Sequence, residues 1–353
     1  MGIALGCLIV MALAIYLLAL VTDEFFIVSL DRISHQWGLP SDVAGASLMA
    51  MGSSAPELAI ALLAIFKAGG AHSDVGIGTI VGSAVFNILV ITGVSAIAMP
   101  AQVTWRVVVR DVVMYVASIA LLLMAFADSR IGLVEALAFL LLYAVYLFIL
   151  SQWKASPEDD ALAVNAPPDR AAPEPATGLL RRGHGGLASG IGVLMGDPHT
   201  RYIRTFLVSV IFIAAISWVL VDTAVLFAGA IGLPPVIVAL TILAAGTSVP
   251  DMMASIIVAR QGRGEMAIAN AVGSNIFDIL IGLGLPWMLV LLMHGGTVRI
   301  GTGELWLSTV VLLSTVVLLF VFLTTGRILS RKEGWALLGV YGAYVGWTWI
   351  GSA

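Results

Sequence analysis

The sequence is poor in charged residues and has a single cysteine. Only 11% of its 353 residues are Asp, Glu, Lys or Arg, 60% are hydrophobic, and the mean hydropathy is +1.06. A chain of this length with so few polar residues cannot cover a soluble globule. The lone Cys7 excludes an intramolecular disulfide. The composition therefore indicates an all-α, multi-pass integral membrane protein in contact with the lipid bilayer.

Several further absences exclude other classes of protein. The 21 acidic and 17 basic residues give a net charge of −4, which does not suggest a nucleic-acid partner. The first apolar run lacks a basic segment before it and is too long for a signal-peptide core, so we expect a retained span. Neither an ATP-binding motif nor a residue set for covalent chemistry is present, so we expect no enzyme activity and no cofactor.

Apolar stretches long enough to cross about 30 Å of hydrocarbon occur ten times. They lie near residues 3–30, 40–66, 74–99, 107–127, 131–153, 203–230, 234–259, 265–293, 303–325 and 334–351. The interval 154–200 combines prolines with charged residues and alanine, a composition that cannot bury enough apolar surface to become ordered. We therefore predict two five-span membrane halves, 1–153 and 201–353, joined by a flexible linker.

The basic residues predict the orientation of these spans. With the N-terminus outside, 14 of the 17 Lys and Arg residues fall on the cytoplasmic side, in agreement with the positive-inside rule. This places the linker 154–200 in the cytoplasm and both termini outside it. Short loops and the lack of a targeting segment favour a prokaryotic inner membrane. The sequence leaves the oligomeric state open.

Two motifs occur once in each half of the chain. GSSAPE at 52–57 returns as GTSVPD at 246–251, an offset of 194, and GSAVFN at 82–87 returns as GSNIFD at 273–278, an offset of 191. Because five spans separate equivalent points, the two copies would cross the membrane in opposite directions. This predicts inverted repeats over about 40–99 and 234–293, an architecture found in secondary transporters. Packing of small residues between helices would explain the glycines but not the acids.

Each motif pairs a hydroxyl with a second oxygen-bearing side chain four residues later. Residues at this spacing share one face of a helix, so four helices could direct eight side chains to one point. The pairs are Ser53 with Glu57, Ser83 with Asn87, Thr247 with Asp251, and Ser274 with Asp278. The pattern predicts an oxygen-lined cation site inside the membrane.

The ligand chemistry narrows the choice of cation. All the candidate ligands are hard oxygens, which suit Ca²⁺, Na⁺ and K⁺ and argue against zinc or copper. Glu57, Asp251 and Asp278 supply up to three negative charges, enough for one divalent ion or several monovalent ones. Mutually exclusive occupancy would make the site an exchanger, and protons are expected to compete for it. Pro56 and Pro250 should also free the carbonyls of the residues four positions earlier.

At these residues the chain resembles the cation/calcium exchanger superfamily. GSSAPE, DVGIGTIVGSAVFNIL, AAGTSVPD and GSNIFDILIGLGLPW are most similar to its potassium-dependent sodium/calcium exchanger branch. The resemblance implies alternate binding of Na⁺ and Ca²⁺, with the first and sixth helices moving as a gate. It also implies a ligand set in which two alanines contribute backbone carbonyls: Ala50, Ser53, Ser54, Glu57, Ser83, Asn87, Ala244, Thr247, Ser248, Asp251, Ser274 and Asp278.

The sequence therefore predicts a sodium-driven calcium antiporter whose partners are small inorganic cations. Potassium co-transport stays open, because an Asp at position 278 is associated with it in the animal branch but also occurs in prokaryotic relatives. Calcium/proton exchange is the alternative, although Ser53 and Ser54 argue against it. A channel would need a continuous polar pore and should show conductance rather than exchange. An intramembrane aspartyl protease would need two opposed aspartates, and it would leave the many coordinating hydroxyls unexplained. Asp23 and Glu24 could line an ion route or mark the edge of the membrane.

Overall fold

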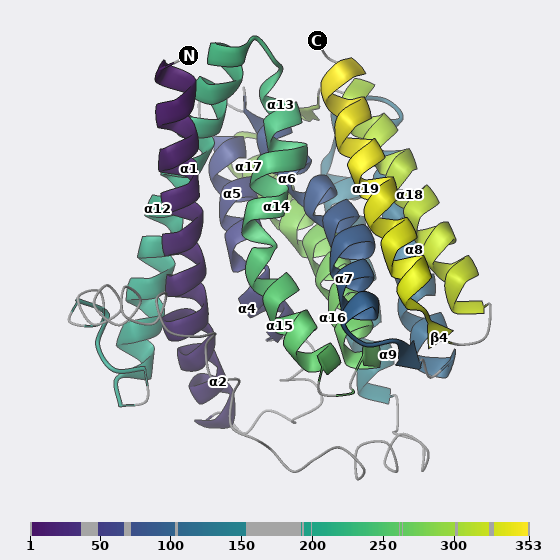
Figure 1. Ribbon diagram of the computed structural model, residues 1–353. Helices are drawn as coiled ribbons and strands as arrows, with labels where there is room; N and C mark the ends of the chain where they lie inside the picture. Colours follow the sequence, from purple (N-terminus) through teal and green to yellow (C-terminus); the bar gives the residue numbers. More distant parts are fainter. Residues whose placement is uncertain are drawn as a thin grey trace.

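We describe the protein from a computed structural model. It describes residues 2–36, 49–66, 72–102, 105–152, 192, 194–198, 200–260, 262, 264–300, 303–324 and 328–351. Most of the predicted linker, and residues 40–48 at the start of the second predicted span, lie outside these ranges. Long helices dominate the described residues, and the two ends of the chain lie at the same end of the bundle (Figure 1).

The first half of the chain begins with a long helix that flanks the bundle. In the element names below, η denotes a π-helical segment. The elements are α1 (Gly2–Val21), η1 (Thr22–Phe26), α2 (Ile27–Gln36), α4 (Met49–Ser53), α5 (Ala55–Phe66), α6 (Ser73–Phe86), η4 (Asn87–Ile91), α7 (Thr92–Ala98), β1 (Ala101–Gln102), α8 (Trp105–Phe126), β2 (Arg130–Ile131) and α9 (Leu133–Gln152).

From the first motif onward, the second half repeats this order of elements. It comprises α12 (Tyr202–Ile231), α13 (Pro235–Val238), η5 (Ala239–Leu243), α14 (Ala244–Thr247), α15 (Val249–Arg260), α16 (Gly264–Phe277), η6 (Asp278–Leu283), α17 (Gly284–His294), β3 (Val298–Arg299), α18 (Gly303–Thr324), β4 (Ile328–Leu329) and α19 (Arg331–Gly351). In Figure 1, α5 lies above α4, whereas α14 lies above α15, so these two matching segments run in opposite directions through the bundle.

Seven helices among the described residues are long and apolar enough to cross a membrane, and an eighth span is counted if the bent pair 235–247 and 249–260 is taken as one. These eight agree with eight of the ten predicted stretches. Of the other two, the stretch 40–66 is described only from Met49 onward. The stretch 334–351 lies in α19, which has 21 residues but starts with Arg331, Lys332 and Glu333 and is less apolar. The count of ten spans stays a prediction.

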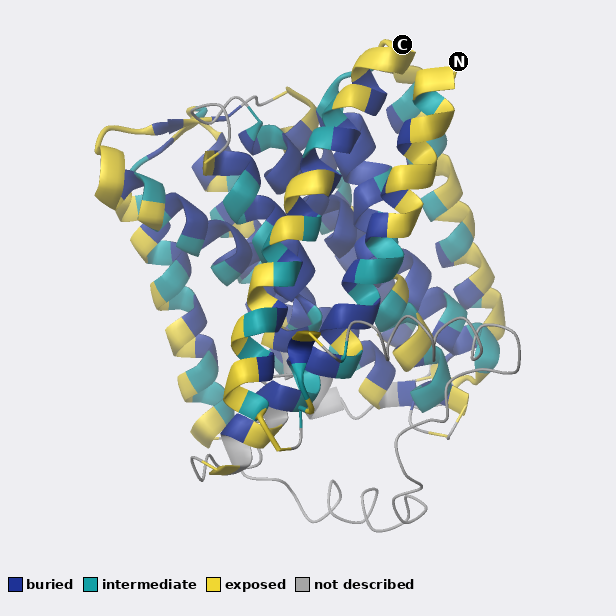
Figure 2. Ribbon diagram, turned by 90° about the vertical axis from the view of Figure 1, so that its left-hand side faces the viewer, coloured by how far each residue is buried: buried dark blue, intermediate teal, exposed yellow. Residues whose placement is uncertain are grey.

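Apolar side chains occupy the outside of the bundle as well as its interior. Val134 and Ile350 are 79% and 81% exposed, and many other Leu, Ile, Val, Met and Trp residues on the long helices are also exposed. Figure 2 shows the buried residues in the middle of the bundle and the exposed ones on the outward faces of the helices. An apolar exterior of this extent requires lipid rather than water as the surrounding solvent.

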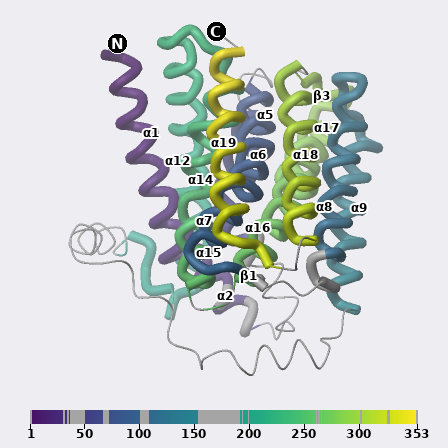
Figure 3. The backbone as a smooth tube through the Cα atoms, turned by 45° about the vertical axis from the view of Figure 1, so that its right-hand side comes forward, coloured from purple at the N-terminus to yellow at the C-terminus, as the bar shows by residue number. Residues whose placement is uncertain are grey.

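The buried apolar residues form two main clusters. The larger cluster joins α6, η4, α7, α8 and α9 of the first half to α16, η6, α17, α18 and α19 of the second. The smaller cluster joins α1, η1 and α12 to one side of α5 and η5. Figures 1 and 3 both show α1 and α12 side by side at one flank of the bundle. The α1–α12 pair thus packs as a separate layer against the rest.

Two short antiparallel strand pairs link the halves. β1 pairs with β4, with Ala101 opposite Leu329, and β2 pairs with β3, with Ile131 opposite Val298. Each pair takes one strand from each half of the chain. Figure 3 shows β1 and β3 at opposite ends of the bundle, so one pair ties the halves together at each end. The larger cluster is therefore fastened by backbone hydrogen bonds as well as by side-chain packing.

Candidate cation-binding site

Both copies of the first motif lie at a break in a helix. α4 ends at Ser53 and α5 begins at Ala55, and in the second half α14 ends at Thr247 and α15 begins at Val249. The second break bends the span by 44°. Each break falls on a serine, Ser54 or Ser248, with a proline two residues later in the first turn of the next helix, where proline is tolerated. The predicted kinks are therefore one-residue breaks in the helix.

These breaks lie between the members of two predicted ligand pairs. Ser53 and Glu57, and likewise Thr247 and Asp251, were expected to share one face of a helix, and each pair spans a one-residue break. Glu57 and Asp251 are the third residues of α5 and α15. The N-terminus of a helix carries a partial positive charge from unpaired N–H groups. The break therefore places each acid in the first turn of a helix, where such N–H groups lie.

Both copies of the second motif end where a helix widens. The π-helical segment η4 starts at Asn87, and η6 starts at Asp278, the equivalent residue at the 191 offset. Segments of this kind are rare and occur frequently at functional sites, because the extra residue redirects side chains and loosens the hydrogen-bond ladder. The structure thus changes the helix geometry at the same point in both repeats.

Hydrogen bonds join the predicted ligands of one repeat to those of the other. The hydroxyls of Ser83 and Ser248 lie 2.8 Å apart, oxygen to oxygen. The Asn87 side-chain amide donates to Oγ of Ser274 at 3.4 Å and to Oδ1 of Asn275 at 2.8 Å. Side chains 165 to 188 positions apart in the sequence therefore meet inside the bundle.

Four oxygen atoms at this junction are buried without a hydrogen-bond partner. They are Ser54 Oγ, Glu57 Oε2, Asn87 Oδ1 and Asp278 Oδ1, and the residues that carry them are no more than 2% exposed. Leaving a buried polar atom unpaired costs about 1–3 kcal/mol, and more when the group is charged. Three of these atoms can only accept hydrogen bonds when both acids are ionised. Cations bound at this junction could take these oxygens as ligands, so the residues present fit a cation site.

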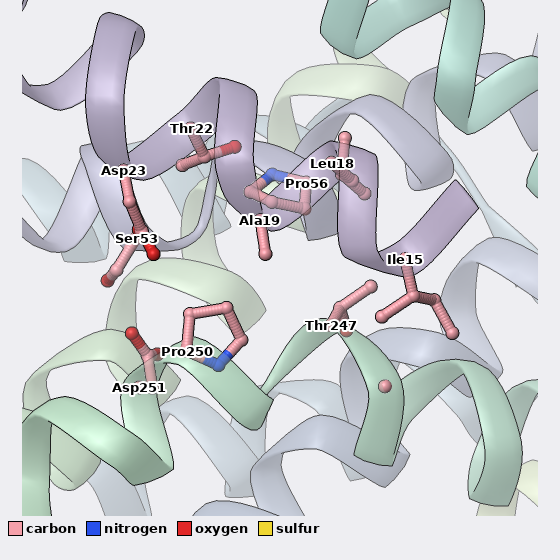
Figure 4. Close-up of a pocket in the computed structure, with 11 residues that line it drawn as sticks. Ile15, Leu18, Ala19, Thr22, Asp23, Ser53, Pro56, Thr247, Pro250 and Asp251 are labelled. Carbon is pink, nitrogen blue, oxygen red and sulfur yellow. The ribbon is translucent and has the colours of Figure 1, made fainter. Parts of the chain in front are cut away.

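A pocket reaches the site from the α1 side. Its lining includes Thr22 and Asp23 from η1, Ser53 and Pro56 from the first break, and four residues around the second break, Gly246, Thr247, Pro250 and Asp251. Figure 4 shows Asp23, Ser53 and Asp251 together at one end of this pocket. Glu57, Asn87 and Asp278 do not line it. The predicted ligands thus divide into a pocket-lining group and a deeper buried group.

The three acids are near one another without converging on one point. Electrostatic interactions link Asp251 to Glu57 and Asp23, and link Asp278 to both Glu57 and Asp251. Across the described part of the chain, however, no three His, Cys, Asp or Glu residues are grouped closely enough to hold a metal ion by themselves. Any cation held here would take hydroxyl, amide and backbone oxygens as well.

The remaining predicted ligands have partners inside their own helices. Thr247 Oγ1 donates to the carbonyls of Leu243 and Ala244, and the Ala244 carbonyl also accepts from the Ser248 N–H. Ser274 Oγ donates to the Ala271 carbonyl. The hydroxyl oxygens of Thr247 and Ser274 keep a lone pair for a cation. Ala50 lies in α4, next to the first break.

Sequence reasoning missed two residues next to the site. Asn275 is fully buried and donates to the Ala84 carbonyl at 3.1 Å and to the Tyr115 hydroxyl at 2.9 Å. The sequence did carry a signal for Asn275. The equivalent residue of the first repeat is Ala84, and an amide in the place of an alanine inside a membrane span indicates a hydrogen-bonding role. Tyr115 lies in α8, outside both repeats, and the sequence carried no signal for it.

The fold and the site define a class of protein: a membrane protein whose interrupted helices bring oxygen-bearing side chains together in its interior. Comparison with known proteins identifies the family. The model of the sodium/calcium exchanger protein family matches residues 7–152 and 202–350. The chain belongs to this family, and its resemblance to the potassium-dependent branch is confirmed.

Two human relatives and two solved structures illustrate the similarity. The chain is 30% identical to human sodium/potassium/calcium exchanger 4, over 94% of this chain and 78% of that protein. It is also 30% identical to human sodium/potassium/calcium exchanger 5, over 93% and 80%. In fold it is similar to the H⁺/Ca²⁺ exchanger CAX, with a TM-score of 0.69, 13% identity and coverage of 95% and 79%. The sodium-calcium exchanger NCX_Mj gives a TM-score of 0.57, 20% identity and coverage of 97% and 98%.

Proposed function

We propose that this protein is a secondary active antiporter that exchanges Na⁺ for Ca²⁺ across a membrane by alternating access. The observation that carries the proposal is the set of four partnerless buried oxygens, contributed by both repeats around the junction of two interrupted helices. Hard oxygen ligands with several carboxylates suit Ca²⁺, and the same ligands can serve Na⁺. The names of the relatives, which describe exchange of sodium, potassium and calcium, support this choice.

The proposed ligands form two groups that follow the structure. Glu57, Asn87, Ser83, Ser274 and Asp278 would hold the cation in the buried interior, together with Ser54 and Ser248 from the breaks. Asp251, Ser53 and Thr247 would receive it from the pocket, and the carbonyls of Ala50 and Ala244 would complete the set. Competition between one Ca²⁺ and several Na⁺ for these oxygens would couple the two fluxes.

Alternating access requires one part of the protein to move against another. We propose ten spans in two inverted five-helix repeats, with the halves at 1–153 and 201–353, in which α1 and α12 move across the site. The separate apolar cluster of α1 and α12 supports this division, since the pair packs as a layer while strand pairs fasten the other helices together. The pocket beside α1 would be the route that this movement opens and closes.

The orientation in the membrane follows from the basic residues. We propose extracytoplasmic termini, a cytoplasmic linker over 154–200 and a prokaryotic inner membrane. The common end of the bundle at which both termini lie is compatible with an even number of spans. Potassium could be carried with calcium, in line with the names of the relatives.

Calcium/proton exchange is the second candidate function. Glu57 and Asp278 are buried, and each leaves one carboxyl oxygen without a partner. A proton could neutralise these groups when the cation leaves, so the same site could couple calcium to protons.

Calcium uptake into liposomes tests both candidates. Purified protein would be reconstituted into sodium-loaded vesicles, and radioactive calcium uptake measured after dilution into sodium-free buffer. We expect uptake to require the sodium gradient and to be lost in Asp278→Asn, with Asp128→Asn as the matched control, because Asp128 is exposed in the loop after α8. Uptake driven by a pH gradient and indifferent to sodium would favour proton exchange. Uptake that needs neither gradient would contradict both candidates.

A further inference from the structure

Tyr115 is a buried residue at the end of a chain of hydrogen bonds that leads to the cation site. It lies in α8, and its side chain is 0% exposed. Its hydroxyl oxygen accepts a hydrogen bond from the Asn275 side-chain amide at 2.9 Å. None of the repeated motifs includes Tyr115, yet it is connected to α16 just before the helix widens at Asp278.

The partners of Asn275 fix the orientation of its side chain. Its amide nitrogen has two hydrogens, and they go to the Tyr115 hydroxyl and to the Ala84 carbonyl, 3.1 Å away. A carbonyl can only accept, so the nitrogen of Asn275 must face Ala84. The oxygen of Asn275 is then turned toward Asn87.

Asn87 is oriented in turn by Asn275. Its amide nitrogen donates to Asn275 Oδ1 at 2.8 Å and to Ser274 Oγ at 3.4 Å, so both of its hydrogens are used. Its own oxygen, Oδ1, is buried and has no partner. An amide differs from a carboxylate because only one of its two ends can bind a cation. Rotation of Asn87 by half a turn would replace a ligand with two N–H donors that repel the cation.

We propose that Tyr115 is a positioning residue for the cation site. Together with the Ala84 carbonyl, its hydroxyl takes both amide hydrogens of Asn275 and so keeps Asn275 in the orientation that turns the Asn87 oxygen toward the buried cation. This inference rests on the proposed function, since the cation it concerns is the transported one. The conformational restraint acts on affinity for the cation, because it fixes a ligand in advance of binding.

Calcium binding to the purified protein tests the proposal separately from transport. Isothermal titration in detergent would give the dissociation constant for Ca²⁺ of the unchanged protein, Tyr115→Phe and Tyr143→Phe. Loss of one neutral hydrogen bond corresponds to a change of about three- to tenfold. We expect Tyr115→Phe to raise the dissociation constant by this factor. Tyr143→Phe should leave it unchanged, because Tyr143 is also buried and packs on Phe277 of α16 but lies outside the hydrogen-bond chain.

A double-mutant cycle separates positioning from a general loss of packing. Asn275→Ala should weaken calcium binding, and adding Tyr115→Phe to it should cause no further loss, because the tyrosine acts only through Asn275. Additive effects in the two backgrounds, or an unchanged dissociation constant in Tyr115→Phe, would overturn the proposal. If Tyr115→Phe fails to fold, a folded Asn275→Ala protein that binds calcium normally would overturn it as well. A parent protein that binds no calcium would instead overturn the proposed function.

Discussion

The two repeats carry different side chains at equivalent positions, and the structure treats those side chains differently. Asn87 starts η4 in the first repeat, and Asp278 starts η6 in the second. The amide of Asn87 is held by two side chains from the other repeat. No hydrogen bond holds Asp278 Oδ1. A carboxylate can offer either oxygen to a cation, whereas an amide must be oriented, so the supporting network is found around Asn87.

The same comparison extends to charge. The first repeat contributes one acid to the site, Glu57, whereas the second contributes Asp251 and Asp278. Duplication therefore supplies a pair of similar scaffolds, and single substitutions on one of them make the site asymmetric. If this asymmetry is needed for function, making the repeats alike or exchanging their side chains should be damaging in predictable ways.

The largest effect is expected when the two side chains are exchanged. Asp278→Asn combined with Asn87→Asp restores the total charge, but the new carboxylate would face Asn275 Oδ1, an oxygen that cannot donate to it. We expect sodium-dependent calcium uptake to stay about 100-fold or more below that of the parent, as in Asp278→Asn alone. Uptake in liposomes measures this, and recovery to the parent rate would show that charge alone defines the site.

A second large difference is expected between two equivalent glycines. A β-carbon on Gly82 would clash with the Leu240 backbone carbonyl, whereas one on Gly273 would meet no atom within 4 Å. Gly82→Ala must therefore displace the backbone of η5, at a cost of about 3 kcal/mol or more, while Gly273→Ala should be nearly neutral. Thermal unfolding of both purified variants in detergent checks this. Equal melting temperatures would contradict the close approach of α6 and η5.

Much of the site could be predicted from the sequence because the duplication marks it twice. The membrane class and eight of the long apolar stretches followed from composition and length, and family membership followed from the repeated motifs. The breaks at Ser54 and Ser248 were foreseen only as proline kinks, since the spacing of Ser53 and Glu57 also fits a continuous helix. The orientation of Asn87 could not be foreseen, because it depends on contacts with Ser274 and Asn275 that form only in the folded chain.

The smallest effect concerns how readily a water-soluble reagent reaches the equivalent positions of Glu57 and Asp251. Glu57 is 2% exposed, whereas Asp251 is partly exposed and lines the pocket beside α1. Cysteine introduced in place of Asp251 should therefore react several-fold faster with a charged, water-soluble thiol reagent than cysteine introduced in place of Glu57. The background would be Cys7→Ala, so that no other thiol is present. Labelling would be followed by mass spectrometry. Equal rates, or faster labelling at position 57, would contradict the difference in access between the two acids.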